Sequence, residues 1–243
     1  GGCYRPRGVR GMKTRTRYTA LLGVLLAGAT LASACGDDRS IAACYLWDAS
    51  RSGVALEPEY RVHIRDSVDG FADQGADVAG LVVKGDARVE ARPIRADFGD
   101  VAGFEKSGER SIAVGDFLDE VDDDADESLS DVRNPTKGSN IIGGLDVLGD
   151  LDCATVIVLS DGIERSRDVD MRIDEIATAV DRRALIETIE RRHGLPDLDG
   201  ADLHFPFGGR RRANGPVWTD RIRYVEPFWA EFAEATGANL IWR

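Results

Sequence analysis

Two apolar runs that each end in an aspartate constrain the fold of this chain more than any other feature. The run "IAACYLWD" ends at Asp48, and the run "CATVIVLSD" ends at Asp161. Both runs are nearly continuous in apolar residues, which predicts strands that are buried on both faces. Strands of this kind occur in parallel sheets covered by helices on either side. The two runs therefore predict an α/β protein.

Helical segments separate the expected strands. The first helix is expected to begin at Glu57 and Pro58, because proline is favoured in a first turn, and to stop at Gly75. Pro93 marks one further strand as an edge strand, since proline cannot donate a ladder hydrogen bond. An acidic helix is expected over 108–128, fading into a loop along its aspartates. Further helices are expected over 138–151, 181–194 and 220–237, and further strands over 76–85, 88–99, 201–209 and 238–242.

This alternation predicts a doubly wound α/β fold, with a mostly parallel central sheet and helices on both faces. The length of 243 residues, with 43% hydrophobic and 30% charged residues, is ordinary for a globular chain that buries a core. The formal net charge of −12 argues against a nucleic-acid partner, because binding phosphates requires a clustered basic surface. Cation binding fits this acidic balance better.

The start of the chain has the order of parts of a secretory signal. From Met12 it has a basic beginning, then an apolar stretch, then small residues before Cys35. The apolar stretch is too short, and too interrupted by glycine and alanine, for a transmembrane span. The letters "LASAC" also resemble the bacterial lipobox, whose cysteine is lipidated. Cys35 is therefore the expected lipidation site, and an ordinary cleaved signal is the alternative.

This interpretation divides the chain into three parts. Residues 1–34 are expected to be an upstream extension followed by a lipoprotein-type signal peptide, 35–40 a short tether, and 41–243 a single domain. The protein is then expected to be exported and lipid-anchored, at the outer face of the bacterial cytoplasmic membrane or in the cell envelope. An exported protein meets an oxidising compartment, so Cys44 and Cys153 are a possible disulfide, with buried free thiols as the alternative.

Oxygen-bearing side chains gather at the two strand ends. Asp48 is followed by Ser50 and Ser52, and Asp161 ends the second run. In doubly wound sheets, ligands bind at the carboxyl ends of the strands, where the strand order reverses. If the two strands are neighbours, their carboxylates meet there, and a hard cation such as Mg²⁺ would relieve the repulsion. Polar turns without any metal are the alternative, because aspartate and serine are also common turn residues.

The segment "DASRS" resembles the D-x-S-x-S element of the von Willebrand factor A (vWA) domain. In that family three loops build a metal-ion-dependent adhesion site. Here "KGSNIIGGL" is similar to the second loop and "VIVLSDG" to the third. Thr136 is the alternative to Ser139 in the second loop, where the family has a threonine. The resemblance places the metal ligands at Asp48, Ser50, Ser52, Ser139 and Asp161.

The resemblance also implies a function. In the family the cation keeps one coordination position open for an acidic side chain of a partner protein. We therefore expect a divalent-cation-dependent adhesion or recognition module that holds Mg²⁺, with Mn²⁺ or Ca²⁺ as other candidates, and binds an acidic residue of a protein ligand. A partly neutralised cation anchors a carboxylate, because its charge offsets the loss of the carboxylate's hydration.

Two other functions compete with this one. The first is a metal-dependent phosphohydrolase of the haloacid dehalogenase type, which needs a second carboxylate two residues after the first; position 50 is serine. The second is a structural lipoprotein with a degenerate metal site. The sequence contains neither a G-x-S-x-G elbow nor a G-x-x-x-x-G-K loop. We therefore expect a binding protein and not an enzyme.

Overall fold

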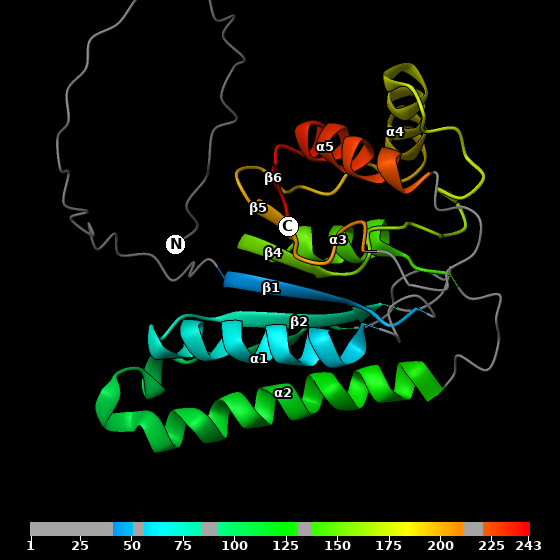
Figure 1. The fold of residues 1–243 in the computed structure, drawn as a ribbon. Coiled ribbons are helices and arrows are strands. Elements are labelled where there is room, and N and C mark those ends of the chain that lie inside the picture. The colour runs from blue at the N-terminus through cyan, green and yellow to red at the C-terminus, as the bar shows by residue number, and fades with distance from the viewer. Residues whose placement is uncertain (1–40, 51–55, 84–91, 131–137, 211–220) are drawn as a thin grey trace, which may run out of the picture. The chain divides into compact units, whose positions relative to one another are not determined.

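Six strands form one sheet in the order β3-β2-β1-β4-β5-β6 (Figure 1). Neighbouring strands run parallel except for β2 and β3, which pair antiparallel. The chain moves outward from β1 through β2 to β3 and then returns to the other side of β1, so the strand order reverses between β1 and β4. The strands are β1 (Ile41–Asp48), β2 (Val78–Val83), β3 (Ile94–Ala96), β4 (Cys153–Leu159), β5 (Asp202–Phe205) and β6 (Asn239–Trp242).

Helices cover both faces of this sheet. In Figure 1, α1 and α2 lie on one side, and α3, α4 and α5 lie on the other. This confirms the doubly wound α/β fold, mostly parallel, that the alternation of strands and helices predicts. The helices are α1 (Glu57–Asp73), α2 (Ser107–Ser130), α3 (Ile141–Gly149), α4 (Ala179–His193) and α5 (Val225–Thr236), with single 3-10 turns at η2 (Gly99–Val101), η3 (Phe104–Lys106) and η6 (Ile222–Tyr224).

The structure is a computed structural model, and part of the chain is described in it. The expected lipidation site Cys35 and two candidate metal ligands, Ser52 and Thr136, lie outside the described residues. None of the helices among the described residues is long and apolar enough to cross a membrane. The described residues are 41–50, 56–83, 92–130, 138–210 and 221–243.

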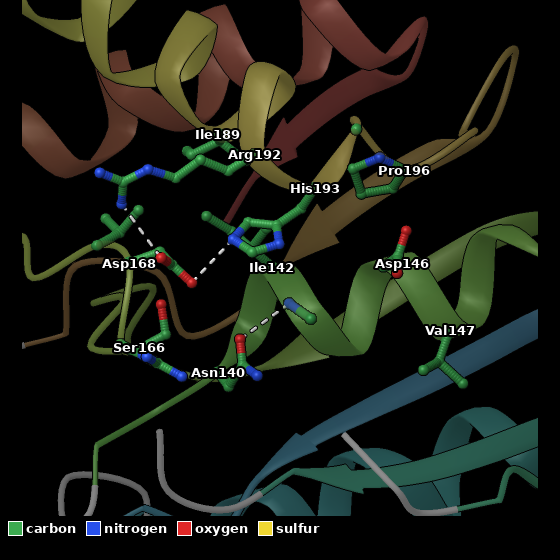
Figure 2. A pocket seen from close by; sticks show the side chains of 14 residues that line it. Asn140, Ile142, Asp146, Val147, Ser166, Asp168, Ile189, Arg192, His193 and Pro196 are labelled. Carbon is green, nitrogen blue, oxygen red and sulfur yellow. Dashed lines mark hydrogen bonds and ion pairs between the residues drawn. The ribbon is translucent and has the colours of Figure 1, made fainter. Parts of the chain in front are cut away.

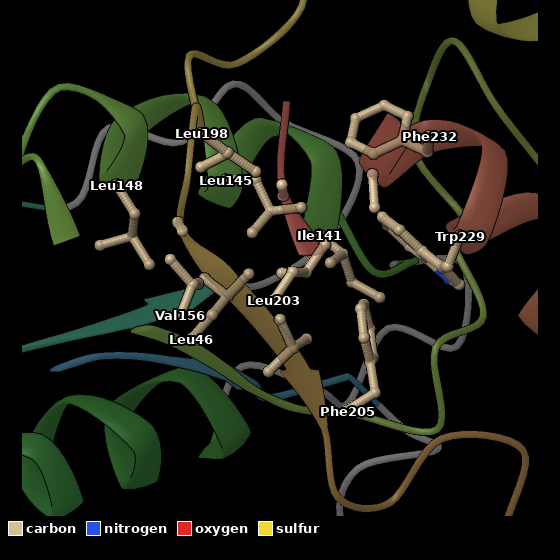
Figure 3. Packing of buried hydrophobic residues seen from close by; sticks show 14 of the residues in the cluster. Leu46, Ile141, Leu145, Leu148, Val156, Leu198, Leu203, Phe205, Trp229 and Phe232 are labelled. Atoms are coloured by element: carbon tan, nitrogen blue, oxygen red, sulfur yellow. The ribbon is translucent and has the colours of Figure 1, made fainter. Parts of the chain in front are cut away.

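The two faces of the sheet bury separate hydrophobic clusters. Successive residues of β1 point to opposite faces, so Leu46 packs beneath α3 while Trp47 packs beneath α1. Figure 3 shows the cluster on the α3 side, which includes Leu46 and Val156 of the sheet and Ile141 of α3. Because every residue of β2 is buried, and all but one of β1, the strands carry no alternating pattern.

Cys44 and Cys153 form a disulfide between β1 and β4. Their Cα atoms lie 6.0 Å apart, and the bond links positions 109 residues apart in the sequence. Both residues are buried within the cluster on the α3 side. The bond therefore links the middle of β1 to the first residue of β4 and fixes the two central strands together.

Helix α2 differs from the expectation that it fades into a loop along its acidic run. It remains helical to Ser130. Arg61 of α1 forms ion pairs with Asp122 and, at 2.8 Å, with Asp126, and Val121 is buried on the face toward the sheet. Packing against α1 and the sheet stabilises a helix whose charge pattern alone suggested a solvated end.

Candidate metal centre

Asp48 lies at the carboxyl end of β1, beside β4, where the strand order reverses. It is fully buried. The Ser160 hydroxyl donates to its Oδ2 at 2.7 Å, and the Ser50 backbone N–H donates to its Oδ1 at 3.0 Å. Burial raises the pKa of Asp48, and the hydrogen bonds from Ser160 and Ser50 partly oppose that rise. A positive charge nearby would therefore stabilise the ionised form of the Asp48 carboxyl.

Asp161 lies two residues after the end of β4, in the third loop. It is 7% exposed, and its Oδ1 accepts a hydrogen bond from the backbone N–H of Ile163 at 3.0 Å. Between these residues Gly162 has a φ of 82°, which glycine adopts without steric cost. The Ser160 hydroxyl also accepts from the Gly162 N–H at 3.1 Å. This tight turn holds Ser160 and Asp161 at the end of the sheet.

Ser139 belongs to the second loop, just before α3. Its carbonyl accepts from the Arg165 N–H at 2.9 Å, so the second and third loops form a short bridge. The Ser139 hydroxyl is buried and has no hydrogen-bond partner of good geometry among the described residues. It still lies near enough to Asp48 to lower that carboxyl's pKa. Asn140, and not Ser139, caps α3, accepting from the Gly143 N–H at 3.0 Å.

Gly138 allows the second loop to approach the third. A Cβ atom at this position would lie 1.8 Å from the Arg165 carbonyl oxygen, far inside any permitted contact. Only a residue without a side chain permits the bridge between Ser139 and Arg165. Gly138 therefore helps to position Ser139, the expected metal ligand.

Glu164 is a further buried acidic residue near the carboxyl ends of β1 and β4. The sequence did not predict it. It is fully buried, and its Oε2 accepts from the N–H groups of Ile141 at 2.8 Å and Ile142 at 3.1 Å, at the start of α3. Its Oε1 has no hydrogen-bond partner of good geometry among the described residues, although the Ser166 side chain lies near enough to oppose the rise in the carboxyl's pKa. Burial raises the pKa of Glu164 to about 8, and the charge of Asp48 contributes to the rise. A glutamate in a polar loop gives no sequence signal of such burial.

Four of the predicted ligands therefore lie on the three loops at one edge of the sheet: Asp48, Ser50, Ser139 and Asp161. The other two, Ser52 and Thr136, lie outside the described residues. Carboxylate and hydroxyl oxygens are donors that suit a hard cation such as Mg²⁺. Within the described part of the chain, no three His, Cys, Asp or Glu side chains are grouped so as to hold a metal ion. A cation here would depend on serine oxygens as well as on two carboxylates.

A pocket of about 840 Å³ lies next to the candidate metal centre but is a different site. It opens between the start of α3 and the end of α4, and Asn140 and Ser166 line part of it (Figure 2). Asp168 forms an ion pair there with Arg192 at 3.2 Å, and the Nε2 atom of His193 lies 2.9 Å from its other carboxylate oxygen; both contacts are drawn as dashed lines in Figure 2. Asp168 is thus paired with Arg192 in this pocket, and neither Asp48 nor Asp161 lines it.

The fold and this edge define a doubly wound α/β domain with buried acidic and hydroxyl side chains where the strand order reverses. No family model and no curated protein matches the chain. Among solved structures, the human COPII-coat protein Sec24c is similar over 84% of this chain, with 13% sequence identity and a TM-score of 0.35. The chain spans 29% of that protein's length. A likeness of this extent does not bear on function.

Proposed function

We propose that this chain is a vWA-like, divalent-cation-dependent protein-binding module that recognises an acidic residue of a partner. The observation that carries the proposal is the pairing of Asp48 with Ser139 where the strand order reverses. Asp48 is a fully buried carboxyl, and the neighbouring Ser139 hydroxyl is buried without a hydrogen-bond partner of good geometry among the described residues. Leaving a buried hydroxyl unpaired costs about 1–3 kcal/mol. A cation bound by both groups would satisfy the hydroxyl and neutralise the carboxylate.

The proposed cation would be held by Asp48, Ser50, Ser139 and Asp161, together with Ser52 from the first loop. Thr136 would take the place of Ser139 if the second loop bound through its earlier hydroxyl. Mg²⁺ is the preferred ion, and Mn²⁺ and Ca²⁺ also accept oxygen ligands. When bound, the ion supplies an electrophilic centre that a carboxylate of the partner can ligate.

The charge of the chain supports a role for the cation in recognition. With a formal net charge of −12, the protein repels an acidic partner at long range. A bound divalent cation would offset the negative charges of Asp48 and Asp161 where β1 and β4 end. Binding of an acidic ligand is therefore expected to depend on the metal, and to be lost on chelation.

The phosphohydrolase alternative receives no support from position 50. Haloacid-dehalogenase chemistry needs an acid or base two residues after the first aspartate. Ser50 occupies that position, and its backbone N–H donates to Asp48. We therefore propose a binding role without turnover, at the outer face of the cytoplasmic membrane or in the cell envelope, with a lipid anchor at Cys35.

Calorimetric titration tests the proposal. After chelation, the wild-type protein is expected to bind Mg²⁺, Mn²⁺ or Ca²⁺ at one site, and Asp48→Asn is expected to abolish binding. Asp146→Asn, which removes an exposed aspartate of α3, is the matched control and should bind as the wild type does. Absence of binding by all three ions in the wild type would overturn the metal site and favour a structural lipoprotein with a degenerate site.

A further inference from the structure

Tyr60, in the first turn of α1, carries a hydroxyl that the rest of the described structure leaves unsatisfied. The residue is fully buried, and its Oη has no hydrogen-bond partner among the described residues. A buried tyrosine hydroxyl normally finds a partner, and leaving one unpaired costs about 1–3 kcal/mol. Phenylalanine would fill the same volume without this cost. The hydroxyl therefore calls for a partner that the described residues do not supply.

The ring of Tyr60 contacts two aromatic residues that lie close to the two aspartates, one in β1 and one just after β5. On one side it packs edge-on against Trp47, the residue before Asp48, with ring centroids 6.0 Å apart. On the other side it packs against Phe207 at 4.8 Å. Phe207 lies two residues before Gly209, whose N–H donates to the Asp161 carbonyl at 2.8 Å. These contacts fix the ring beside the end of the sheet that bears both carboxylates.

The electrostatics of the ring agree with this placement. Burial raises the pKa of Tyr60, and the charges of Asp48 and Asp161 raise it further. Glu59 adds to the rise, and Arg210 opposes it. The hydroxyl thus experiences the negative field of both aspartates, and remains protonated and neutral. A neutral hydroxyl can accept a hydrogen bond without adding charge to the site.

We propose that Tyr60 is an outer-sphere residue of the metal centre, whose Oη accepts a hydrogen bond from a water molecule bound to the cation. The proposal deepens the proposed function and depends on it. Mg²⁺ keeps several of its waters when bound to protein, and each such water donates hydrogen bonds outward. The tyrosine oxygen is one of the few buried acceptors that the described residues leave without a hydrogen-bond partner. Groups that hold the outer shell of a metal commonly change its affinity by about 10–100-fold.

The test compares two tyrosine-to-phenylalanine variants by calorimetric titration with Mg²⁺ and by urea unfolding after chelation. Tyr60→Phe is expected to weaken Mg²⁺ binding by about tenfold. Without metal it is expected to be as stable as the wild type or more stable, since no hydrogen bond to a described residue is lost. Tyr45→Phe is the matched control, because the Tyr45 hydroxyl donates to Ser67 at 2.9 Å. That control should lose stability and keep wild-type Mg²⁺ affinity.

The possible results separate this inference from the function on which it depends. If the wild type binds Mg²⁺ and Tyr60→Phe binds it equally well, the outer-sphere role is wrong while the metal site stands. If Tyr60→Phe loses stability without metal as Tyr45→Phe does, the hydroxyl has a structural partner, and the role is again wrong. If the wild type binds no cation, the metal site itself fails. Weaker Mg²⁺ binding with unchanged metal-free stability is the result that supports the inference.

Discussion

The Ser160 hydroxyl donates a hydrogen bond of 2.7 Å to Asp48, although 112 residues separate them in the sequence. The bond joins the carboxyl ends of β1 and β4, the two strands between which the order of the sheet reverses. The same hydroxyl accepts from the Gly162 N–H. Ser160 therefore connects the first loop of the candidate metal centre to the turn that carries Asp161.

Replacing Ser160 by alanine should destabilise the protein. The variant leaves both the buried Asp48 carboxylate and the Gly162 N–H without this partner, and we expect a loss of about 1–3 kcal/mol in the free energy of unfolding. Urea unfolding monitored by circular dichroism measures the loss. Ser111→Ala, an exposed change in α2, should cost nothing, because alanine favours the helix. Equal stability of the two variants would contradict the connecting role of Ser160.

Replacing Gly138 by alanine should disrupt the second loop. The added Cβ would meet the Arg165 carbonyl oxygen at 1.8 Å, so the bridge between the second and third loops could not form. We expect a loss of about 3 kcal/mol or more, as for other severe steric changes. Gly115→Ala, inside α2 with open space at its Cβ, is the control and should gain up to about 1 kcal/mol. The urea unfolding midpoints of the two variants, each compared with that of the wild type, measure the expected loss and the expected gain.

Replacing Glu164 by glutamine should change how stability depends on pH. Burial raises the pKa of Glu164 from its usual 4.5 to about 8. Between these values the folded protein holds a proton that the unfolded chain has released, so this group lowers stability as the pH rises through that window. Below the window both states are protonated and the effect vanishes, and above it the penalty is constant.

Glutamine cannot ionise, and its carbonyl can still accept from the α3 N–H groups. The advantage of Glu164→Gln over the wild type should therefore grow between about pH 5 and about pH 8, on the order of 1 kcal/mol per pH unit. Urea unfolding of both proteins across this range measures the difference, in which contributions common to both cancel. A difference that does not vary with pH would show that Glu164 is ionised in the folded protein.

Reducing the disulfide between Cys44 and Cys153 should destabilise the domain without changing its fold. The bond closes a loop across 109 residues, which strongly restricts the unfolded chain. Loss of such a bond typically costs about 2–4 kcal/mol. Unfolding with and without a thiol reductant measures the cost. The double variant Cys44→Ala with Cys153→Ala is the control: reductant should leave its stability unchanged.

The sequence by itself determined the alternation of strands and helices, and with it the fold class. It also marked Asp48 and Asp161 as strand-end carboxylates, because a long apolar run followed by a polar residue is a local signal. The start of α1 at Glu57 and Pro58 and the edge position of the strand after Pro93 were predictable for the same reason. Each of these features depends on residues that are close together in the chain.

Only the tertiary structure decided which groups meet. The pairing of β1 with β4, the bond from Ser160 to Asp48, and the burial of Glu164 and Tyr60 arise from contacts between distant segments. The helical continuation of α2 also depended on a distant partner, Arg61. A glutamate or tyrosine has the same letter whether it is solvated or buried, and its burial is set by packing. The physical chemistry of the candidate centre therefore follows from packing that no local pattern records.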